Sequence, residues 1–135
     1  MSRILVVEDS PDNMKLFRTL LRLKGHEVTE LWSGEGLLAS IETARPELVL
    51  MDIQLPGKDG FALLAEIRES LHRGLRVIAL TAHAMSGDRE RAMRAGFDGY
   101  ITKPIDIRQF PEQVARALAG EMVSPLSPDA GRHDD

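Results

Sequence analysis

Short runs of consecutive apolar residues alternate along this chain with segments in which apolar residues recur every three or four positions. The apolar runs predict five strands, at residues 3–7, 26–31, 48–51, 77–80 and 99–102. The runs at 3–7, 48–51 and 77–80 are almost entirely apolar, which is typical of strands buried on both faces of a parallel sheet. Charged residues at alternate positions of 26–31 instead predict an edge strand.

A segment of helical period follows each predicted strand, and residues with capping preferences stand at several of the predicted helix starts. Ser10 is expected to cap the first helix, Ser33 to open the second and Asp59 to cap the third. Asp106 and the glutamine three residues later form a capping-box-like pair before the last helix. Five strand–helix units joined by right-handed crossovers predict an α/β fold, in which helices cover both faces of a five-stranded parallel sheet.

The composition is that of an ordinary globular domain of 135 residues, 43% of them hydrophobic and 28% charged. We expect the domain to span residues 1–119 and a disordered tail to span 120–135, where the apolar periodicity stops. The absence of cysteine excludes disulfide and thiolate chemistry and favours a cytoplasmic location. The net charge of −4 argues against nonspecific binding to nucleic acid, and no apolar run approaches the roughly 20 residues that span a membrane.

Reactive side chains stand directly after four of the predicted strands. Glu8 and Asp9 follow the first, Asp52 follows the third, Thr81 follows the fourth and Lys103 follows the fifth. The carboxyl ends of parallel strands meet at one edge of a sheet, where ligands bind in such folds. Any one of these side chains alone could simply be solvated at the end of its strand. Their joint occurrence favours a functional site.

Three carboxylates at one edge of a sheet need a compensating positive charge. Two unit charges about 4 Å apart repel by about 4 kcal/mol at an effective dielectric constant of about 20. One lysine does not offset three carboxylates, so we predict a bound Mg²⁺, a cation that prefers oxygen ligands and retains water.

The same residues suit phosphoryl transfer, which depends on positioning and charge neutralisation. Asp52 is the candidate nucleophile, and Lys103, the Thr81 hydroxyl and the backbone N–H of Ala82 are candidates for binding the phosphoryl oxygens. No histidine follows these strands directly, so neither a Ser-His-Asp triad nor a zinc hydrolase is supported.

Four segments, Val-Val-Glu-Asp, Leu-Met-Asp-Ile-Gln-Leu-Pro, Ala-Leu-Thr-Ala and Tyr-Ile-Thr-Lys-Pro-Ile, resemble the signature segments of response-regulator receiver domains. The resemblance extends from about residue 3 to 118, and residues 13–17 and 81–85 further resemble the DivK-type single-domain regulators. It implies the CheY-like, flavodoxin-like (βα)5 fold with strand order 2-1-3-4-5.

The resemblance also implies a role for each residue of the predicted site. Asp52 would accept a phosphoryl group from a phosphohistidine of a histidine kinase or a phosphotransfer protein. Its Mg²⁺, with Mn²⁺ as an alternative, would be held by the carboxylates of Asp9 and Asp52 and the backbone oxygen of Gln54, with Glu8 acting through water. Lys103 corresponds to the lysine of the family, followed by a peptide bond to Pro104 that is usually cis.

In the receiver family, a threonine and an aromatic residue form a switch pair, which here corresponds to Thr81 and Tyr100. The phosphoryl group would draw the Thr81 hydroxyl inward, and Tyr100 would fill the vacated space. The resulting change would reach an output face made of the fourth helix, the last strand and the last helix.

Four further residues have weaker indications of function. Gln54 and His83 lie close enough in sequence to the predicted site to be candidates for tuning the lifetime of the phosphorylated form. Met14 and Phe17 on the first helix are either core residues or candidates for docking a partner protein.

The leading interpretation is a cytoplasmic single-domain response regulator, since the segment after the last helix is too short for an output domain. It would be a phosphoacceptor rather than an enzyme, would control a downstream protein as a monomer or weak dimer, and would bind neither nucleic acid nor membrane. One alternative is a receiver-like interaction module that is not phosphorylated. Another is a phosphatase of the haloacid-dehalogenase type, which needs its nucleophile on the first strand with an acid two residues later, whereas Gln54 stands two residues after Asp52.

Overall fold

The structure is a computed structural model that describes residues 2–55, 57, 60–82 and 86–121, without the side chains of 86–89. Its strands are β1 (Arg3–Val7), β2 (Glu27–Leu31), β3 (Leu48–Asp52), β4 (Arg76–Thr81) and β5 (Tyr100–Thr102). Its helices are α1 (Pro11–Leu23), α2 (Leu37–Ala44), α3 (Gly60–Arg68), α4 (Ser86–Ala95) and α5 (Phe110–Leu118).

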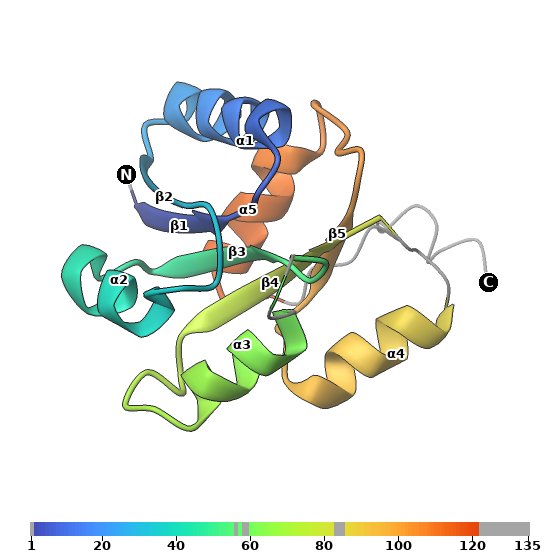
Figure 1. Cartoon of the computed structure of the whole chain (residues 1–135). Helices are drawn as coiled ribbons and strands as arrows, with labels where there is room; N and C mark the ends of the chain where they lie inside the picture. The colour runs from blue at the N-terminus through green and yellow to red at the C-terminus, as the bar shows by residue number, and fades with distance from the viewer. Residues whose placement is uncertain (1, 56, 58–59, 83–85, 122–135) are drawn as a thin grey trace.

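The strands form one parallel sheet in the order β2-β1-β3-β4-β5 (Figure 1). The central strand β3 is buried along its whole length, as its apolar run predicts. The edge strand β2 has no buried residue, in agreement with its alternating charges. The predicted fold class and strand order are therefore confirmed.

Two layers of helices cover the sheet, with α1 and α5 on one face and α2, α3 and α4 on the other (Figure 1). Successive residues of each strand face opposite layers, because side chains alternate along a strand. On β3, Leu48 and Leu50 pack under α1 and α5, whereas Val49 and Met51 pack against α2 and α3. This double burial holds the carboxyl ends of the central strands in place.

The first helix begins as predicted. The Ser10 Oγ accepts a hydrogen bond from the backbone N–H of Asn13 at 3.3 Å, and Pro11 occupies the first helical position. This cap ends the β1–α1 loop one residue after Asp9, so it also limits the conformations available to the acids at the end of β1.

The start predicted for the second helix is wrong. Ser33 does not open α2, which begins at Leu37 after Gly36 in the left-handed conformation (φ 75°). The Ser33 Oγ instead accepts from the backbone N–H of Glu35 at 3.2 Å, which stabilises a local turn that competes with helix. The expected cap at Asp59 lies outside the described residues.

Before α5, the Asp106 carboxylate accepts hydrogen bonds from the backbone N–H groups of Arg108 (2.8 Å) and Gln109 (3.2 Å). The helix itself begins at Phe110, with Gln109 as its N-cap. Of the predicted capping pair, Asp106 therefore accepts backbone hydrogen bonds as expected, but about one turn before the helix begins.

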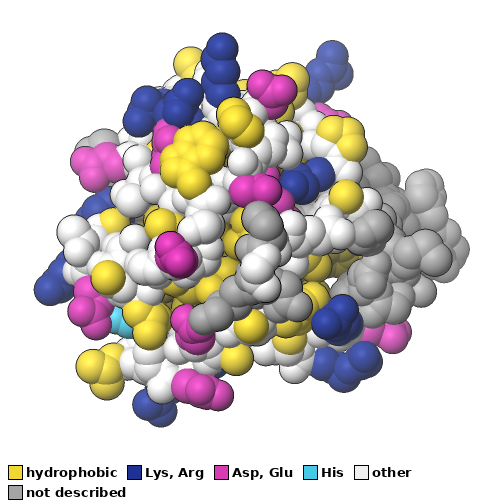
Figure 2. All heavy atoms as spheres, viewed as in Figure 1, with side chains coloured by type: hydrophobic (Ala, Val, Ile, Leu, Met, Phe, Trp, Pro, Cys, Tyr) yellow, Lys and Arg dark blue, Asp and Glu magenta, His cyan; other side chains and the backbone are white. Residues whose placement is uncertain are grey.

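Acidic and basic side chains are interspersed on the face shown in Figure 2, with hydrophobic side chains scattered between them. Within the described part of the chain, no helix is both long and apolar enough to span a bilayer. The predicted domain boundary at residue 119 stays a prediction, since all of the predicted tail beyond residue 121 lies outside the described residues.

Candidate functional site

The carboxyl ends of β1, β3, β4 and β5 bring four of the predicted side chains to one edge of the sheet. Glu8, Asp52 and Thr81 are the buried polar residues there, with exposed fractions of 0%, 2% and 2%. Lys103 follows β5 and its side chain is 15% exposed. Four strands far apart in sequence thus supply one nearly enclosed polar cluster.

The Lys103 ammonium lies between two carboxylates. Its Nζ is 2.8 Å from Asp52 Oδ2 and 3.2 Å from Glu8 Oε1. The peptide bond to Pro104 is cis, and the backbone N–H of Lys103 donates to the Thr81 carbonyl at 2.7 Å. The backbone of Lys103 is therefore tied to the end of β4, which orients its side chain towards β3.

Each of the two buried carboxylates also accepts a backbone hydrogen bond through its second oxygen. The Gln54 N–H donates to Asp52 Oδ1 at 2.8 Å, and the Ser10 N–H donates to Glu8 Oε2 at 3.0 Å. All four carboxylate oxygens thus have a donor, which offsets part of the cost of burying charge.

Burial raises the pKa of Glu8 above its ordinary value of 4.5, and the negative charge of Asp52 raises it further. The hydrogen bond from the Ser10 N–H and the positive charge of Lys103 lower it, but they do not reverse the shift. Burial alone would lower the pKa of Lys103, but the hydrogen bond and charge of Asp52, together with Glu8, more than reverse this and raise it. Lys103 therefore remains an ammonium ion, whereas the carboxylate form of Glu8 is disfavoured by its surroundings.

A third carboxylate, that of Asp9, stands at the exposed side of the cluster. One oxygen from each of Glu8, Asp9 and Asp52 lies within 4.8 Å of the others. This oxygen-only donor set, with one exposed member open to water, fits the preferences of Mg²⁺. The role predicted for the Gln54 backbone oxygen stays a prediction.

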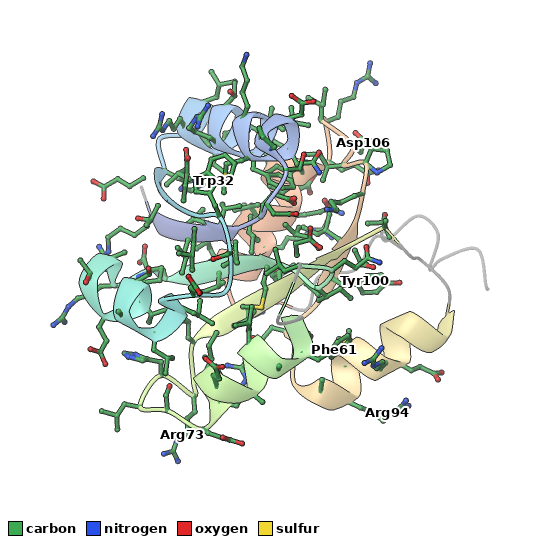
Figure 3. All side chains as sticks on the ribbon, viewed as in Figure 1. Trp32, Phe61, Arg73, Arg94, Tyr100 and Asp106 are labelled. Carbon is green, nitrogen blue, oxygen red and sulfur yellow. The ribbon has the colours of Figure 1, made fainter. Side chains whose placement is uncertain are left out.

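The predicted switch pair occupies neighbouring strands. Thr81 ends β4 and Tyr100 begins β5, where it pairs with Ala79 (Figure 3). Tyr100 is 3% exposed and packs in the core beneath α3 and α4. Ala82 is exposed just beyond Thr81, as expected for an open approach to the site. His83 lies outside the described residues.

The docking role predicted for Met14 and Phe17 is corrected by their positions. Their exposed fractions are 0% and 1%, and the Phe17 ring lies 5.5 Å from the Phe110 ring in the core between α1 and α5. The helical spacing that singled them out marks the buried face of α1, so a partner cannot contact them in this structure.

One polar cluster, just beyond the end of α4, was not predicted from the sequence. The Arg68 guanidinium, at the end of α3, donates to the Gly96 carbonyl at 2.8 Å and to Asp98 Oδ2 at 3.0 Å. That oxygen also accepts from the Val77 N–H at 2.8 Å. Thirty residues separate Arg68 from Asp98, so no local pattern could have paired them.

Residues 4–115 match the sequence model of the response regulator receiver domain. The chain belongs to this family. Receiver domains are the parts of two-component systems that interact with histidine kinases and downstream targets. The residues that form the candidate site all lie within the matched region.

Similar proteins include regulators and sensor kinases. The chain is 40% identical over 116 residues to the polar-differentiation response regulator DivK of Brucella anthropi, covering 85% of this chain and 94% of that protein. It is 41% identical over 118 residues to the sensor histidine kinase GacS of Pseudomonas protegens, covering 84% of this chain but only 13% of that kinase. The first is a regulator of similar length, and the second is a much longer kinase.

A solved structure resembles the chain in fold and sequence. It is the receiver domain of the sensor histidine kinase PA1611 from Pseudomonas aeruginosa, with a TM-score of 0.79 and 36% identity over 87% of this chain and 98% of that one. That structure has a magnesium ion coordinated in its active-site cleft. The acidic cluster of the present chain lies in a domain of the same fold.

Proposed function

We propose that the protein is a response regulator that accepts a phosphoryl group on Asp52 from a phosphohistidine of a histidine kinase or phosphotransfer protein. The observation that carries the proposal is the Lys103 ammonium held between the buried carboxylates of Asp52 and Glu8. A lysine that merely neutralised a surface acid would not need two buried partners from different strands.

In the proposed reaction, a carboxylate oxygen of Asp52 forms a bond to phosphorus. The bond between phosphorus and the donor imidazole nitrogen breaks, and its electron pair returns to that nitrogen. Lys103, the Thr81 hydroxyl and the Ala82 N–H bind the phosphoryl oxygens, where negative charge is greatest. Because Thr81 and Asp52 are almost fully buried, these interactions act with little competition from water.

The carboxylates of Asp9 and Asp52, the backbone oxygen of Gln54 and, through water, Glu8 would hold Mg²⁺, with Mn²⁺ as an alternative. The ion would supply the positive charge that the carboxylates and the phosphoryl group together require. The proximity of the three carboxylates supports this assignment.

Phosphorylation would act on a partner protein through α4, β5 and α5, with Thr81 and Tyr100 as the switch pair. The strand pairing of β4 with β5 supports this, because it connects the two residues directly to the output face. The protein would not turn over a substrate beyond its own phosphorylation and dephosphorylation, for whose rate Gln54 and His83 stay candidates. A cytoplasmic location, a monomeric or weakly dimeric state and the absence of nucleic-acid binding remain predictions.

Intact mass after incubation with Mg²⁺ and acetyl phosphate tests the proposal. The wild type should gain one phosphate and Asp52→Asn should gain none, whereas Asp12→Asn, an exposed acid on α1, should behave as the wild type. No gain with any donor would contradict the proposal and favour an interaction module that is not phosphorylated. Turnover of a phosphomonoester beyond stoichiometric amounts would instead favour the phosphatase alternative.

A further inference from the structure

An arginine of α4 stacks on an aromatic ring of α3. The guanidinium carbon of Arg91 lies 4.0 Å from the centroid of the Phe61 ring. Figure 3 places Phe61 in α3 on the side that faces α4. The Phe97 ring packs edge-on against Phe61, with centroids 5.7 Å apart and an interplanar angle of 82°. These contacts join the two helices next to the proposed output face.

The described side chains of α4 differ in their burial. Among its described side chains, Ala92 is buried, and Arg91 is exposed. After the helix ends, Arg68 binds the Gly96 carbonyl and Asp98, which fixes that end to the sheet. The stacked Arg91 and the buried Ala92 therefore position the described part of α4 that precedes this end.

The backbone beside Phe61 contacts the backbone beside Asp52. The Gly60 N–H donates to the Ile53 carbonyl at 3.2 Å, and the Ile53 N–H donates to the Leu80 carbonyl at 3.0 Å. The two segments are so close that a Cβ on Gly60 would lie 2.6 Å from Ile53 Cα. A displacement of the chain next to Asp52 is thus passed directly to the first turn of α3.

In the described arrangement, the two oxygens of Asp52 accept from the Gln54 N–H and the Lys103 ammonium. The stacking of Arg91 on Phe61 belongs to the same arrangement. A phosphoryl group on Asp52 would take over the bond from Lys103 and shift the adjoining Ile53, whose carbonyl accepts from the N–H of Gly60 next to Phe61.

We propose that the Phe61–Arg91 contact is a regulatory contact that holds α4 in its position while Asp52 is unphosphorylated, and that phosphorylation weakens it. This inference rests on the proposed function and adds a route from Asp52 to α4 besides Thr81 and Tyr100. Because coupling between two sites is reciprocal, loss of the contact must favour the phosphorylated form. An exposed cation–π contact is weak, so it adjusts the balance by about 2- to 5-fold.

Affinity for beryllofluoride, an analogue of the phosphoryl group, measures this effect in saturating Mg²⁺. Arg91→Gln and Phe61→Leu should each lower the Kd by about 2- to 5-fold. The double variant should gain no more than either single variant, because both remove the same contact. Arg94→Gln is the matched control, since Arg94 lies on the same helix with a side chain 73% exposed near Glu90, and its Kd should not change.

A second measurement reads the contact directly. In the wild type, the ring current of Phe61 should give the Arg91 side-chain protons chemical shifts that differ from those in Phe61→Leu. Binding of beryllofluoride to the wild type should move these chemical shifts towards the values in Phe61→Leu. Unchanged or weaker binding by Arg91→Gln, fully additive effects, or Arg91 resonances unmoved by bound beryllofluoride would each overturn the inference. If the wild type bound no beryllofluoride and gained no phosphate, the proposed function would fail and this inference with it.

Discussion

At the scale of single residues, Lys103 and Glu8 illustrate how the site balances burial against charge. The Lys103 ammonium offsets the charges of two carboxylates at once. Because folding raises the pKa of Lys103, this contribution to stability is fully present below a pH of about 10.5 and is lost as the pH rises through the pKa of the folded state. Glu8 is the costly member, because it has no exposed surface and shares its ammonium with Asp52.

The raised pKa of Glu8 leads to a prediction about pH. A carboxyl group whose pKa is raised by folding contributes stability below a pH of about 4.5. This stability is lost as the pH rises through the pKa of the group in the folded state. Glu8→Gln keeps an oxygen for the Ser10 N–H but removes the charge. In metal-free buffer at pH 7, its free energy of unfolding should exceed that of the wild type, and the difference should shrink as the pH falls towards 4.5.

Urea unfolding across this pH range checks the prediction, with Glu35→Gln, an exposed glutamate, as the control. Saturating Mg²⁺ should reverse the order at pH 7, because the cation stabilises the form with the full set of carboxylates. A wild type more stable than Glu8→Gln at pH 7 without metal would contradict the expected cost of the buried charge.

At the scale of secondary-structure elements, the loop between β3 and α3 connects Asp52, the proposed phosphoacceptor, to the first turn of α3. The described parts of this loop are held by the bond from the Gly60 N–H to Ile53 and by the burial of Leu55. Gly60, the first residue of α3, does not have the positive φ that favours glycine. Its close approach to Ile53 is therefore the reason that a side chain does not fit there.

Gly60→Ala should therefore destabilise the domain. The new methyl group would lie 2.6 Å from Ile53 Cα, a backbone atom that cannot move without shifting β3 or α3. The expected cost is about 1–3 kcal/mol, the usual range for overpacking, measured by urea unfolding. Gly74→Ala, where a Cβ meets no atom within 4 Å, should change stability by less than about 1 kcal/mol. Equal stability of the two variants would show that the β3–α3 loop relaxes freely.

At the scale of the whole molecule, the strand order determines which side chains can meet. Because β1 and β3 are neighbours, the carboxylates that follow them converge, and β4 and β5 bring Thr81 and Lys103 to the same edge. The cluster formed by Glu8, Asp9 and Asp52 exists only in the folded chain, so a cation that binds it must stabilise the fold.

Thermal unfolding with and without Mg²⁺ tests this linkage. At a Mg²⁺ concentration of about 100 times Kd, the wild type should gain about 2.7 kcal/mol of stability and a corresponding increase in Tm. Asp9→Asn should lose most of this gain, whereas Glu112→Gln, an exposed acid on α5, should retain it. The same increase in Tm for Asp9→Asn as for the wild type would exclude Asp9 as a ligand.

The sequence by itself determined the strands, their order of connection and the acids, threonine and lysine at one edge of the sheet. These follow from local patterns, since an apolar run ends where burial ends and parallel strands place their carboxyl ends together. The Ser10 cap was equally predictable, because the side chain and the N–H that it binds are three residues apart.

Only the tertiary structure decided the remaining points. The helical spacing of apolar residues is the same whether they face the core or a partner protein, so the sequence did not show that Met14 and Phe17 are buried. Ser33 forms a turn where a helix start was expected, because Gly36 takes the left-handed conformation and α2 begins only after it. The stacking of Arg91 on Phe61 joins residues thirty positions apart, and such contacts depend on how the helices pack across the sheet rather than on local sequence.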